Sequence, residues 1–169
     1  MFEKAPVMES ESDMALQCAF LTRNLERSAA WWARITGQPL GEVWSNAPRE
    51  VTNCTYKGEP IEGIHRQVIL RYKGMFIELI EPDPDEKNVW NDWLDAHGEG
   101  FHHIGFRIPN MAEGRRRLEE AGYSTLQTGN FPGGQYLYSD TESDGDFIVE
   151  LLWFEPDFGK WLEDRFPAN

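Results

Sequence analysis

Residues 16–25 read LQCAFLTRNL and residues 102–111 read HHIGFRIPNM, at a constant offset of 86 residues. Each stretch predicts a strand that turns into a helix, with Asn24 and Asn110 placed to cap the helix N-termini. Gly37 and Gly122 stand where the two helices should end. A strand and a helix repeated with the same caps indicate that the chain is built from two related halves.

Further strand-like runs follow each predicted helix. Residues 67–72 and 75–80, joined at Lys73-Gly74, and residues 134–139 and 147–153 read as antiparallel strands, with a turn-rich loop at 140–146. One more helix is expected between the halves, with one face formed by Val89, Trp90, Trp93, Leu94 and His97. Helical spacing also predicts the pairs that can face the sheet, Trp32 with Ile35 and Leu118 with Ala121. This order of elements predicts an α+β fold.

The composition is that of a globular protein with an acidic balance. The chain has 169 residues and 19.5 kDa, which suits one domain or two half-domains that share a core. Its 29 acidic residues outnumber 16 basic ones, and the net charge of −13 disfavours nucleic acid as a partner. Seven acids lie in each of the ranges 81–99 and 140–157, so the acidity is concentrated there. The rest of the chain is not acidic overall, and an anionic small molecule therefore remains a possible substrate.

Other sequence features concern location. Cys18 and Cys54 give no disulfide framework and suit a reducing cytoplasm. No apolar run approaches the ~20 residues of a membrane span, so no membrane partner is expected. Residues 1–13 are polar and acidic, which predicts a disordered tail rather than a signal peptide.

Polar side chains interrupt the first strand of each half. Alternation in the strand 102–108 places Ile104, Phe106 and Ile108 on one face and His103, Gly105 and Arg107 on the other. The first group can pack on a helix, whereas the second must face something polar. Gln17 takes the place of His103 in the first copy.

A carboxylate sits late in each half, inside an apolar strand. Glu78 lies between Phe76 and Ile80 on its face, and Glu150 lies between two apolar residues in the same way. A carboxylate is costly to bury there unless it is paired, protonated or bound to a metal. With Gln17 and His103 these residues offer one imidazole nitrogen and three oxygens, a donor set that suits Mg, Mn, Co, Ni or Zn. A carboxylate beside such a metal could remove a proton next to a carbonyl group.

Three stretches together resemble a known superfamily: FIELIEP at 76–82, GEGFHHIGF at 98–106 and DGDFIVEL at 144–151. They are similar to the vicinal oxygen chelate superfamily, which includes glyoxalase I, methylmalonyl-CoA epimerase, extradiol dioxygenases and bleomycin-resistance proteins. The resemblance implies two βαβββ modules that form a cupped mixed sheet around a metal site. It divides the chain into a tail (1–13), a first module (14–82), a linker helix (83–100), a second module (101–154) and a C-terminal extension (155–169).

The resemblance also implies roles for the four polar residues. Gln17, Glu78, His103 (rather than His102) and Glu150 would be the metal ligands, and Glu78 or Glu150 would also be the catalytic base. The local pattern is epimerase-like, whereas glutamine on the first strand resembles some glyoxalase I enzymes. The resemblance implies a metal-dependent isomerase or epimerase acting on a small molecule such as an acyl thioester or 2-substituted acid. A glyoxalase I-like lyase and a non-catalytic bleomycin-resistance-type binder are the alternatives, and a homodimer is left open.

Each candidate also has a purely structural interpretation. His103 could be a hydrogen-bonded core residue, Gln17 could cap a sheet edge, and Glu78 could pair with Arg71 or Arg107, with a similar ion pair for Glu150. His102 and His97 are expected to be surface or packing residues. Residues 131–134 are expected to form a turn, or else a substrate-contacting loop. Residues 115–117, all arginine, are expected to be a solvated helix face, or else a phosphate contact.

Overall fold

The structure is a computed structural model that describes Met8 and residues 14–39, 43–46, 51–72 and 74–157. The predicted tail apart from Met8, the turn residue Lys73, and residues 158–169 of the predicted extension lie outside the described residues. The elements are, in chain order, β1 (Met14–Leu21), α1 (Leu25–Thr36), β2 (Val43–Asn46), β3 (Thr52–Tyr56), β4 (Glu59–Pro60), β5 (His65–Tyr72), β6 (Met75–Pro82), α2 (Val89–His97), β7 (Gly100–Arg107), α3 (Met111–Ala121), β8 (Thr125–Phe131), β9 (Gly134–Ser139), α4 (Glu142–Gly145) and β10 (Ile148–Phe154). The predicted α+β class is confirmed, and the loop predicted at 140–146 contains the short helix α4.

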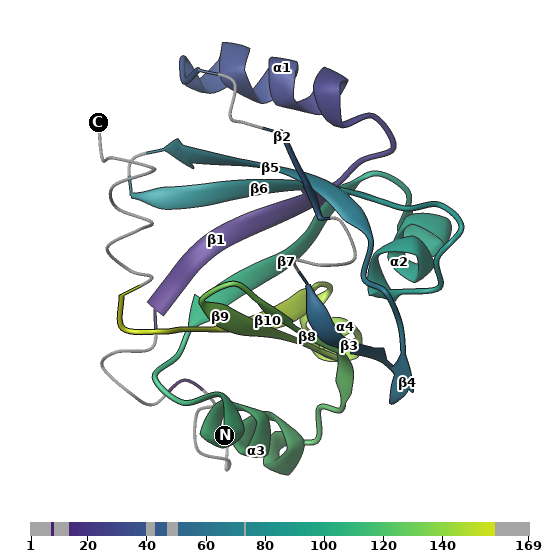
Figure 1. Ribbon diagram of the computed structural model, residues 1–169, viewed down its shortest axis with the longest axis vertical. Helices are drawn as coiled ribbons and strands as arrows, with labels where there is room; N and C mark the ends of the chain where they lie inside the picture. Colours follow the sequence, from purple (N-terminus) through teal and green to yellow (C-terminus); the bar gives the residue numbers. More distant parts are fainter. Residues whose placement is uncertain (1–7, 9–13, 40–42, 47–50, 73, 158–169) are drawn as a thin grey trace.

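The strands form one mixed sheet in the order β2-β5-β6-β1-β7-β10-β9-β8-β3-β4. At its centre β1 pairs antiparallel with β7, and each of them has a parallel neighbour on its other side, β6 beside β1 and β10 beside β7. The two predicted halves therefore meet through their first strands within one chain. Figure 1 shows the sheet curved, with α1 and α3 on its outer side.

One hairpin crosses between the halves. The strands β3 and β4 come from the first half of the sequence but pair at the far edge of the sheet, where Thr55 lies opposite Thr128 of β8. The remaining strands of the first half, β2, β5 and β6, stay beside β1. The strands that follow α1 are thus divided between the two ends of the sheet.

The predicted helix ends are confirmed. The side chain of Asn24 accepts a hydrogen bond from the Arg27 backbone N–H at 2.9 Å, and Asn110 accepts one from the Glu113 N–H at 3.1 Å. The helices α1 and α3 end at Gly37 and Gly122, whose φ angles of 71° and 102° lie in the left-handed region that favours glycine.

The predicted inward orientation of Ile35 is wrong, because this side chain is 59% exposed. The buried residues of α1 are Leu25 and Ala29, and Trp32 continues their face by packing on Phe20 with ring centroids 5.0 Å apart. At about 100° of rotation per residue, Ile35 lies on the flank of that face. In α3 the prediction for Leu118 is confirmed by its burial.

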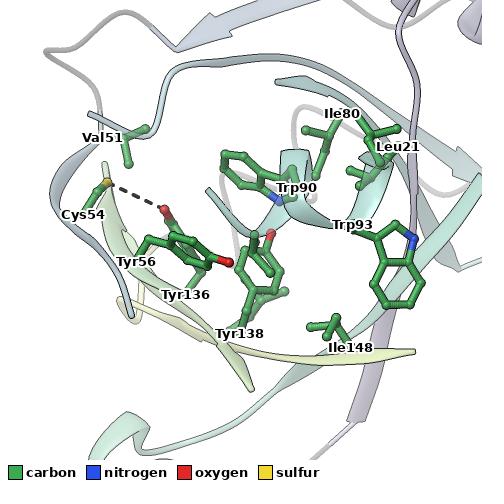
Figure 2. Close-up of a cluster of buried hydrophobic side chains, with 13 residues drawn as sticks. Leu21, Val51, Cys54, Tyr56, Ile80, Trp90, Trp93, Tyr136, Tyr138 and Ile148 are labelled. Carbon is green, nitrogen blue, oxygen red and sulfur yellow. Dashed lines mark hydrogen bonds between the residues drawn. The ribbon is translucent and has the colours of Figure 1, made fainter. Parts of the chain in front are cut away.

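The helix α2 packs against the inner side of the sheet, where Trp90 and Trp93 lie among side chains of the strands (Figure 2). Its buried residues Val89, Trp90, Trp93 and Leu94 join one cluster with side chains of the curved strands, among them Leu21, Ile80, Tyr136, Tyr138, Ile148 and Leu152. His97, predicted to share this face, is exposed but stacks on Trp93 at 4.0 Å. Separate clusters lie under α1 and α3 on the outer side.

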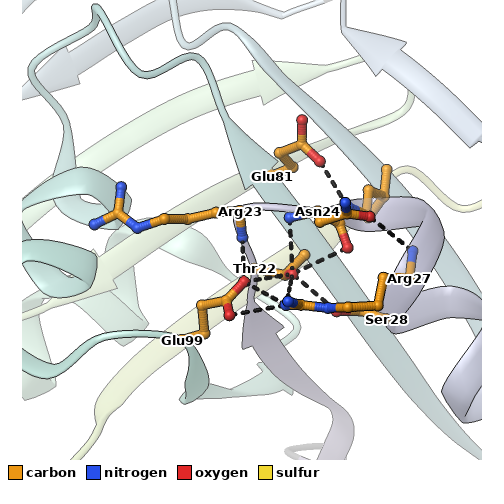
Figure 3. Close-up of polar contacts among 8 residues, drawn as sticks. Thr22, Arg23, Asn24, Arg27, Ser28, Glu81 and Glu99 are labelled. Carbon is orange, nitrogen blue, oxygen red and sulfur yellow. Dashed lines mark hydrogen bonds and ion pairs between the residues drawn. The ribbon is translucent and has the colours of Figure 1, made fainter.

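A polar network ties the segment before β7 to the start of α1 (Figure 3). The Glu99 carboxylate accepts hydrogen bonds from the Arg23 backbone N–H at 2.6 Å, the Thr22 hydroxyl at 3.0 Å, and the Arg27 guanidinium at 2.7 and 2.8 Å. The bonds from Arg27 and Arg23 outweigh slight desolvation and lower the pKa of Glu99 to about 2.

Among the helices of the described residues, none has the length and apolar character of a membrane-spanning segment.

Candidate metal centre

Two β-bulges interrupt the pairing of the central strands β1 and β7, one beside Gln17 and one beside His103. The pairing of β1 with β7 shifts register between Ala15 and Gln17, and again between Ala19 and Phe20. The extra residues are Leu16 on β1 and His102 on β7. They stand at the same offset as the sequence repeat, so the bulges are equivalent features of the two halves. A bulge re-aims the side chains next to it.

The bulge on β7 turns His102 as well as His103 to the inner side. His102 has no exposed surface, and its ring lies 5.1 Å from that of Trp93 and 5.8 Å from that of Tyr138, both members of the inner cluster. His102 is therefore a packing residue, whereas His97 is the surface one. Strict alternation would have sent His102 to the outer face with Ile104.

The four candidate residues come together from four neighbouring strands. Gln17 lies on β1, Glu78 on β6, His103 on β7 and Glu150 on β10. One ligand atom from each of Glu78, His103 and Glu150 lies within 4.8 Å of the others. The Gln17 Nε2 donates to Glu78 Oε2 at 3.1 Å and to Glu150 Oε2 at 2.7 Å. The sequence predicted this convergence, since both carboxylates lie on the faces that alternation assigned to them.

The cluster is almost closed to solvent. His103 is 0% exposed, Glu150 3%, and Gln17 and Glu78 8% each. The His103 Nε2 lies 3.2 Å from Glu150 Oε2 and 3.4 Å from Glu78 Oε2. Two carboxylates so close together in a buried site are stabilised by a positive charge between them or by a proton on one of them.

The electrostatics of the site reflect this requirement. Burial alone would lower the pKa of His103, but the carboxylates of Glu150 and Glu78 outweigh it and raise the pKa to about 9. Burial raises the pKa of Glu150, and the charge of Glu78 adds to the rise while the imidazolium of His103 opposes it. A proton on His103 would supply a positive charge that the two carboxylates share.

The donor set and the space beside it fit a divalent cation. Among the described residues the buried His103 Nε2 has no hydrogen-bond partner of good geometry, although it faces both carboxylates. A Cβ on Gly105 would lie 2.6 Å from Gln17 Cγ and 2.8 Å from Glu150 Oε2, so only glycine leaves this side of the cluster free. The orientation of an amide group is assigned from its hydrogen bonds, so the Gln17 amide can also be placed the other way round. Its oxygen would then be a fourth metal ligand.

The turn predicted at 131–134 and the exposed positions predicted for Arg115 and Arg116 are confirmed, whereas the Arg117 side chain is only 11% exposed and does not belong to a solvated face. Residues 131–134 connect β8 to β9 through a turn at Pro132 and Gly133. Arg116 pairs with Glu113 and Glu120 along the exposed surface of α3. The Arg71 guanidinium lies 5.5 Å over the Phe76 ring, beside the strand that carries Glu78.

Two features near the site were not predicted from the sequence, the contact of His102 with His103 and the position of Tyr138. The His102 Nδ1 lies 2.8 Å from the His103 Nδ1. Tyr138 on β9 is the backbone partner of Glu150, and its ring lies 4.9 Å from that of His103. The alternation of Tyr136 and Tyr138 marks an inner face, but only the pairing of β9 with β10 shows that Tyr138 reaches Glu150.

Comparison with known proteins identifies the family. Residues 16–138 match the family model described as the glyoxalase/bleomycin resistance protein/dioxygenase superfamily. The chain therefore belongs to this superfamily, as its sequence motifs predicted. Among curated protein sequences, none matches the chain significantly.

Solved structures with the same fold include methylmalonyl-CoA epimerases. The enzyme from Mycobacterium tuberculosis is 16% identical, with a TM-score of 0.57 over 86% of this chain and 91% of that one. A variant of the Streptomyces coelicolor enzyme in complex with 2-nitronate-propionyl-CoA is 15% identical, with a TM-score of 0.54 over 83% and 96%. A hypothetical protein from Bacillus halodurans is 16% identical, with a TM-score of 0.60 over 86% and 96%. At these identities the similarity establishes the fold.

Proposed function

We propose that this protein is a divalent-metal-dependent enzyme that removes and returns a proton next to a carbonyl group. The favoured reaction is epimerisation of an acyl thioester or a related 2-substituted acid. The observation that carries the proposal is the buried group of Glu78, His103 and Glu150 within 4.8 Å, with Gln17 in contact with both carboxylates. Solved epimerase structures with a similar fold, in complex with methylmalonyl-CoA and with 2-nitronate-propionyl-CoA, support the choice of substrate class.

The ligand roles follow from the donor atoms. Glu78 and Glu150 would each give one oxygen, His103 its Nε2 and Gln17 its amide oxygen. Two carboxylates balance the charge of a divalent ion, and one imidazole with oxygen donors leaves room for a substrate oxygen. When bound, such an ion polarises the substrate carbonyl and stabilises the negative charge that develops on its oxygen.

The carboxylates would carry out the proton transfer. Burial raises the pKa of Glu150, which makes its carboxylate a stronger base than an exposed glutamate. Glu78 and Glu150 lie on strands on opposite sides of the central pair β1 and β7. If one carboxylate takes the proton from the carbon and the other returns it to the opposite face, the carbon is inverted. If the same carboxylate returns it, the proton exchanges without inversion.

Solvent-deuterium exchange tests this reaction. The metal-loaded protein is incubated in deuterated water with methylmalonyl-CoA and a panel of other 2-substituted acyl-CoA compounds, and label at the carbon next to the carbonyl is followed by mass spectrometry. We expect label to enter at least one compound. Absence of exchange across the panel, from protein shown to hold metal, would contradict an epimerase-like function.

The substitution Glu150→Gln assigns the exchange to this site. It keeps the shape of the side chain but removes its charge and basicity, so we expect the exchange rate to fall at least ~1,000-fold and metal affinity to fall about 10-fold or more. Glu155→Gln is the matched control, because Glu155 is an exposed glutamate just beyond β10. Wild-type exchange in Glu150→Gln would remove Glu150 from the site.

Gln17 favours a second candidate reaction, because glutamine on the first strand resembles some glyoxalase I enzymes. A gain of thioester absorbance, as the hemithioacetal formed from methylglyoxal and glutathione is isomerised to its thioester, would reveal such lyase activity. A non-catalytic binder is the third candidate. It would show no stoichiometric divalent metal and no change in melting temperature on metal addition.

A further inference from the structure

We propose that His102 is a positioning residue, whose Nδ1 accepts the Nδ1–H of His103 and so keeps the His103 Nε2 directed at Glu78 and Glu150. This inference rests on the proposed metal site and adds a residue to it. The observation behind it is the contact of 2.8 Å between the two Nδ1 atoms.

The contact requires one proton between two nitrogen atoms. Two unprotonated nitrogens would repel each other through their lone pairs, and two N–H groups would clash. One ring therefore donates a hydrogen bond and the other accepts it. Both rings are 0% exposed, so water does not compete for this bond. The bond therefore fixes the tautomers of both rings relative to one another.

The direction of the bond follows from the other end of His103. Its Nε2 faces the carboxylate oxygens of Glu78 and Glu150 at 3.4 and 3.2 Å. To bind a cation through Nε2, a neutral imidazole must carry its only proton on Nδ1. His103 is then the donor and His102 the acceptor, and His102 carries its own proton on Nε2.

Two aromatic side chains pack around the His102 ring. The Trp93 ring stands edge-on to it, with centroids 5.1 Å apart and an interplanar angle of 82°. The Tyr138 ring contacts it from another side, at 5.8 Å and 65°. The bulge on β7 supplies the backbone geometry that brings two successive imidazoles to the same face. His102 therefore connects helix α2, through Trp93, to His103.

Metal affinity tests the positioning role. His102→Leu removes the acceptor nitrogen and fills its place with an apolar side chain. We expect this variant to bind Co²⁺ or Zn²⁺ about 10- to 100-fold more weakly than the wild type. His102→Asn places an amide oxygen near the position of Nδ1, so we expect it to restore most of that loss. His97→Leu is the matched control, because His97 stacks on the same Trp93 at 4.0 Å but is exposed. Equal weakening by His102→Leu and His102→Asn, or affinity of His102→Leu within about threefold of wild type, would overturn the inference.

The tautomers themselves give a second readout, which does not require metal. Long-range ¹H–¹⁵N correlation spectra of the wild-type protein should show His102 neutral and protonated on Nε2, with or without Zn²⁺. A proton on the His102 Nδ1 would contradict the inference even if every variant binds metal poorly. If the wild-type protein binds no metal, the proposed function fails, while this spectrum still tests the bond between the two histidines.

Discussion

At the scale of single residues, the site depends on one positive charge shared by Glu78 and Glu150. In the metal-free protein that charge is the proton on His103, whose pKa is raised to about 9. A divalent cation would take the same place, since His103 must be neutral to act as a ligand. Proton and metal therefore compete for one position.

This competition predicts the pH dependence of metal binding. At pH 7 His103 is protonated, so binding should release about one proton, and affinity should rise with pH until it levels off near pH 9. Calorimetry in buffers of different ionisation enthalpy measures the released proton. Affinity that does not change between pH 7 and 9 would show that His103 is not a ligand.

The same raised pKa affects the stability of the metal-free protein. A group whose pKa is higher when folded stabilises the fold below its unfolded pKa, about 6.5 for histidine, and loses that effect as pH rises through the folded value. The melting temperature of the metal-free protein should therefore fall between pH 6.5 and about 9. The metal-loaded protein, in which His103 is already neutral, should lack this part of the decline.

The absence of a side chain at Gly105 leaves room beside Gln17 and Glu150. A Cβ there would lie 2.8 Å from Glu150 Oε2 and 2.6 Å from Gln17 Cγ. Gly105→Ala should displace both side chains and weaken metal binding at least ~10-fold, as measured by competition with a chelator. Gly145→Ala, whose Cβ would meet only ordinary contacts at 3.6 Å, is the control and should bind metal like wild type.

The sequence predicted that the four candidate residues would come together, but not the contact of His102 with His103 or the position of Tyr138. Alternation along a strand assigns all four side chains to the inner face correctly. Glu78 and Glu150 lie in unbroken ladders, and Gln17 and His103 each begin the regular stretch that follows a bulge. The bulge at His102 breaks that alternation, and a period of two cannot anticipate an inserted residue. Tyr138 depends on strand register, which no local pattern specifies.

At the scale of elements, the helices follow from local signals. The caps at Asn24 and Asn110 and the glycines that end α1 and α3 are local features, so the sequence located them. The orientation of Ile35 depends on how α1 lies against the sheet, and the spacing of apolar residues did not fix it. The inner position of α2, with Trp90 and Trp93 in the hollow, likewise depends on tertiary packing.

The Glu99 network predicts a pH-dependent link between elements. Because the pKa of Glu99 is lowered to about 2, its carboxylate stabilises the fold above the unfolded pKa near 4.5, and that effect is lost as pH falls toward 2. Glu99→Gln should lower the free energy of unfolding by about 0.5–1 kcal/mol at pH 7, the range for exposed ion pairs. The difference from wild type should shrink between pH 4.5 and 2.

Denaturant titrations at several pH values measure this difference. Glu59→Gln is the control, because Glu59 is exposed on the short edge strand β4 and lies outside the network. A constant difference between wild type and Glu99→Gln down to pH 2 would mean that the charge of Glu99 does not stabilise the fold.

At the scale of the whole molecule, the site lies at the seam between the two halves. The sequence repeat predicted that the halves would contribute equivalent residues, and the pairing of β1 with β7 explains how they meet. The crossing of the hairpin β3–β4 to β8 could not be predicted, because pairs such as Thr55 with Thr128 join distant parts of the chain. The curved sheet brings four strands to one cluster of donors.

The metal content of the purified protein shows whether Glu78, His103 and Glu150 form a metal centre. The protein is incubated in turn with Mg²⁺, Mn²⁺, Co²⁺, Ni²⁺ and Zn²⁺, desalted, and measured by inductively coupled plasma mass spectrometry beside the double variant with Glu78→Gln and Glu150→Gln. We predict about one ion per chain with at least one of these metals, and less than about a tenth of that in the double variant. Equal metal content in both proteins, or no retained metal in the wild type, would contradict a metal centre at this site.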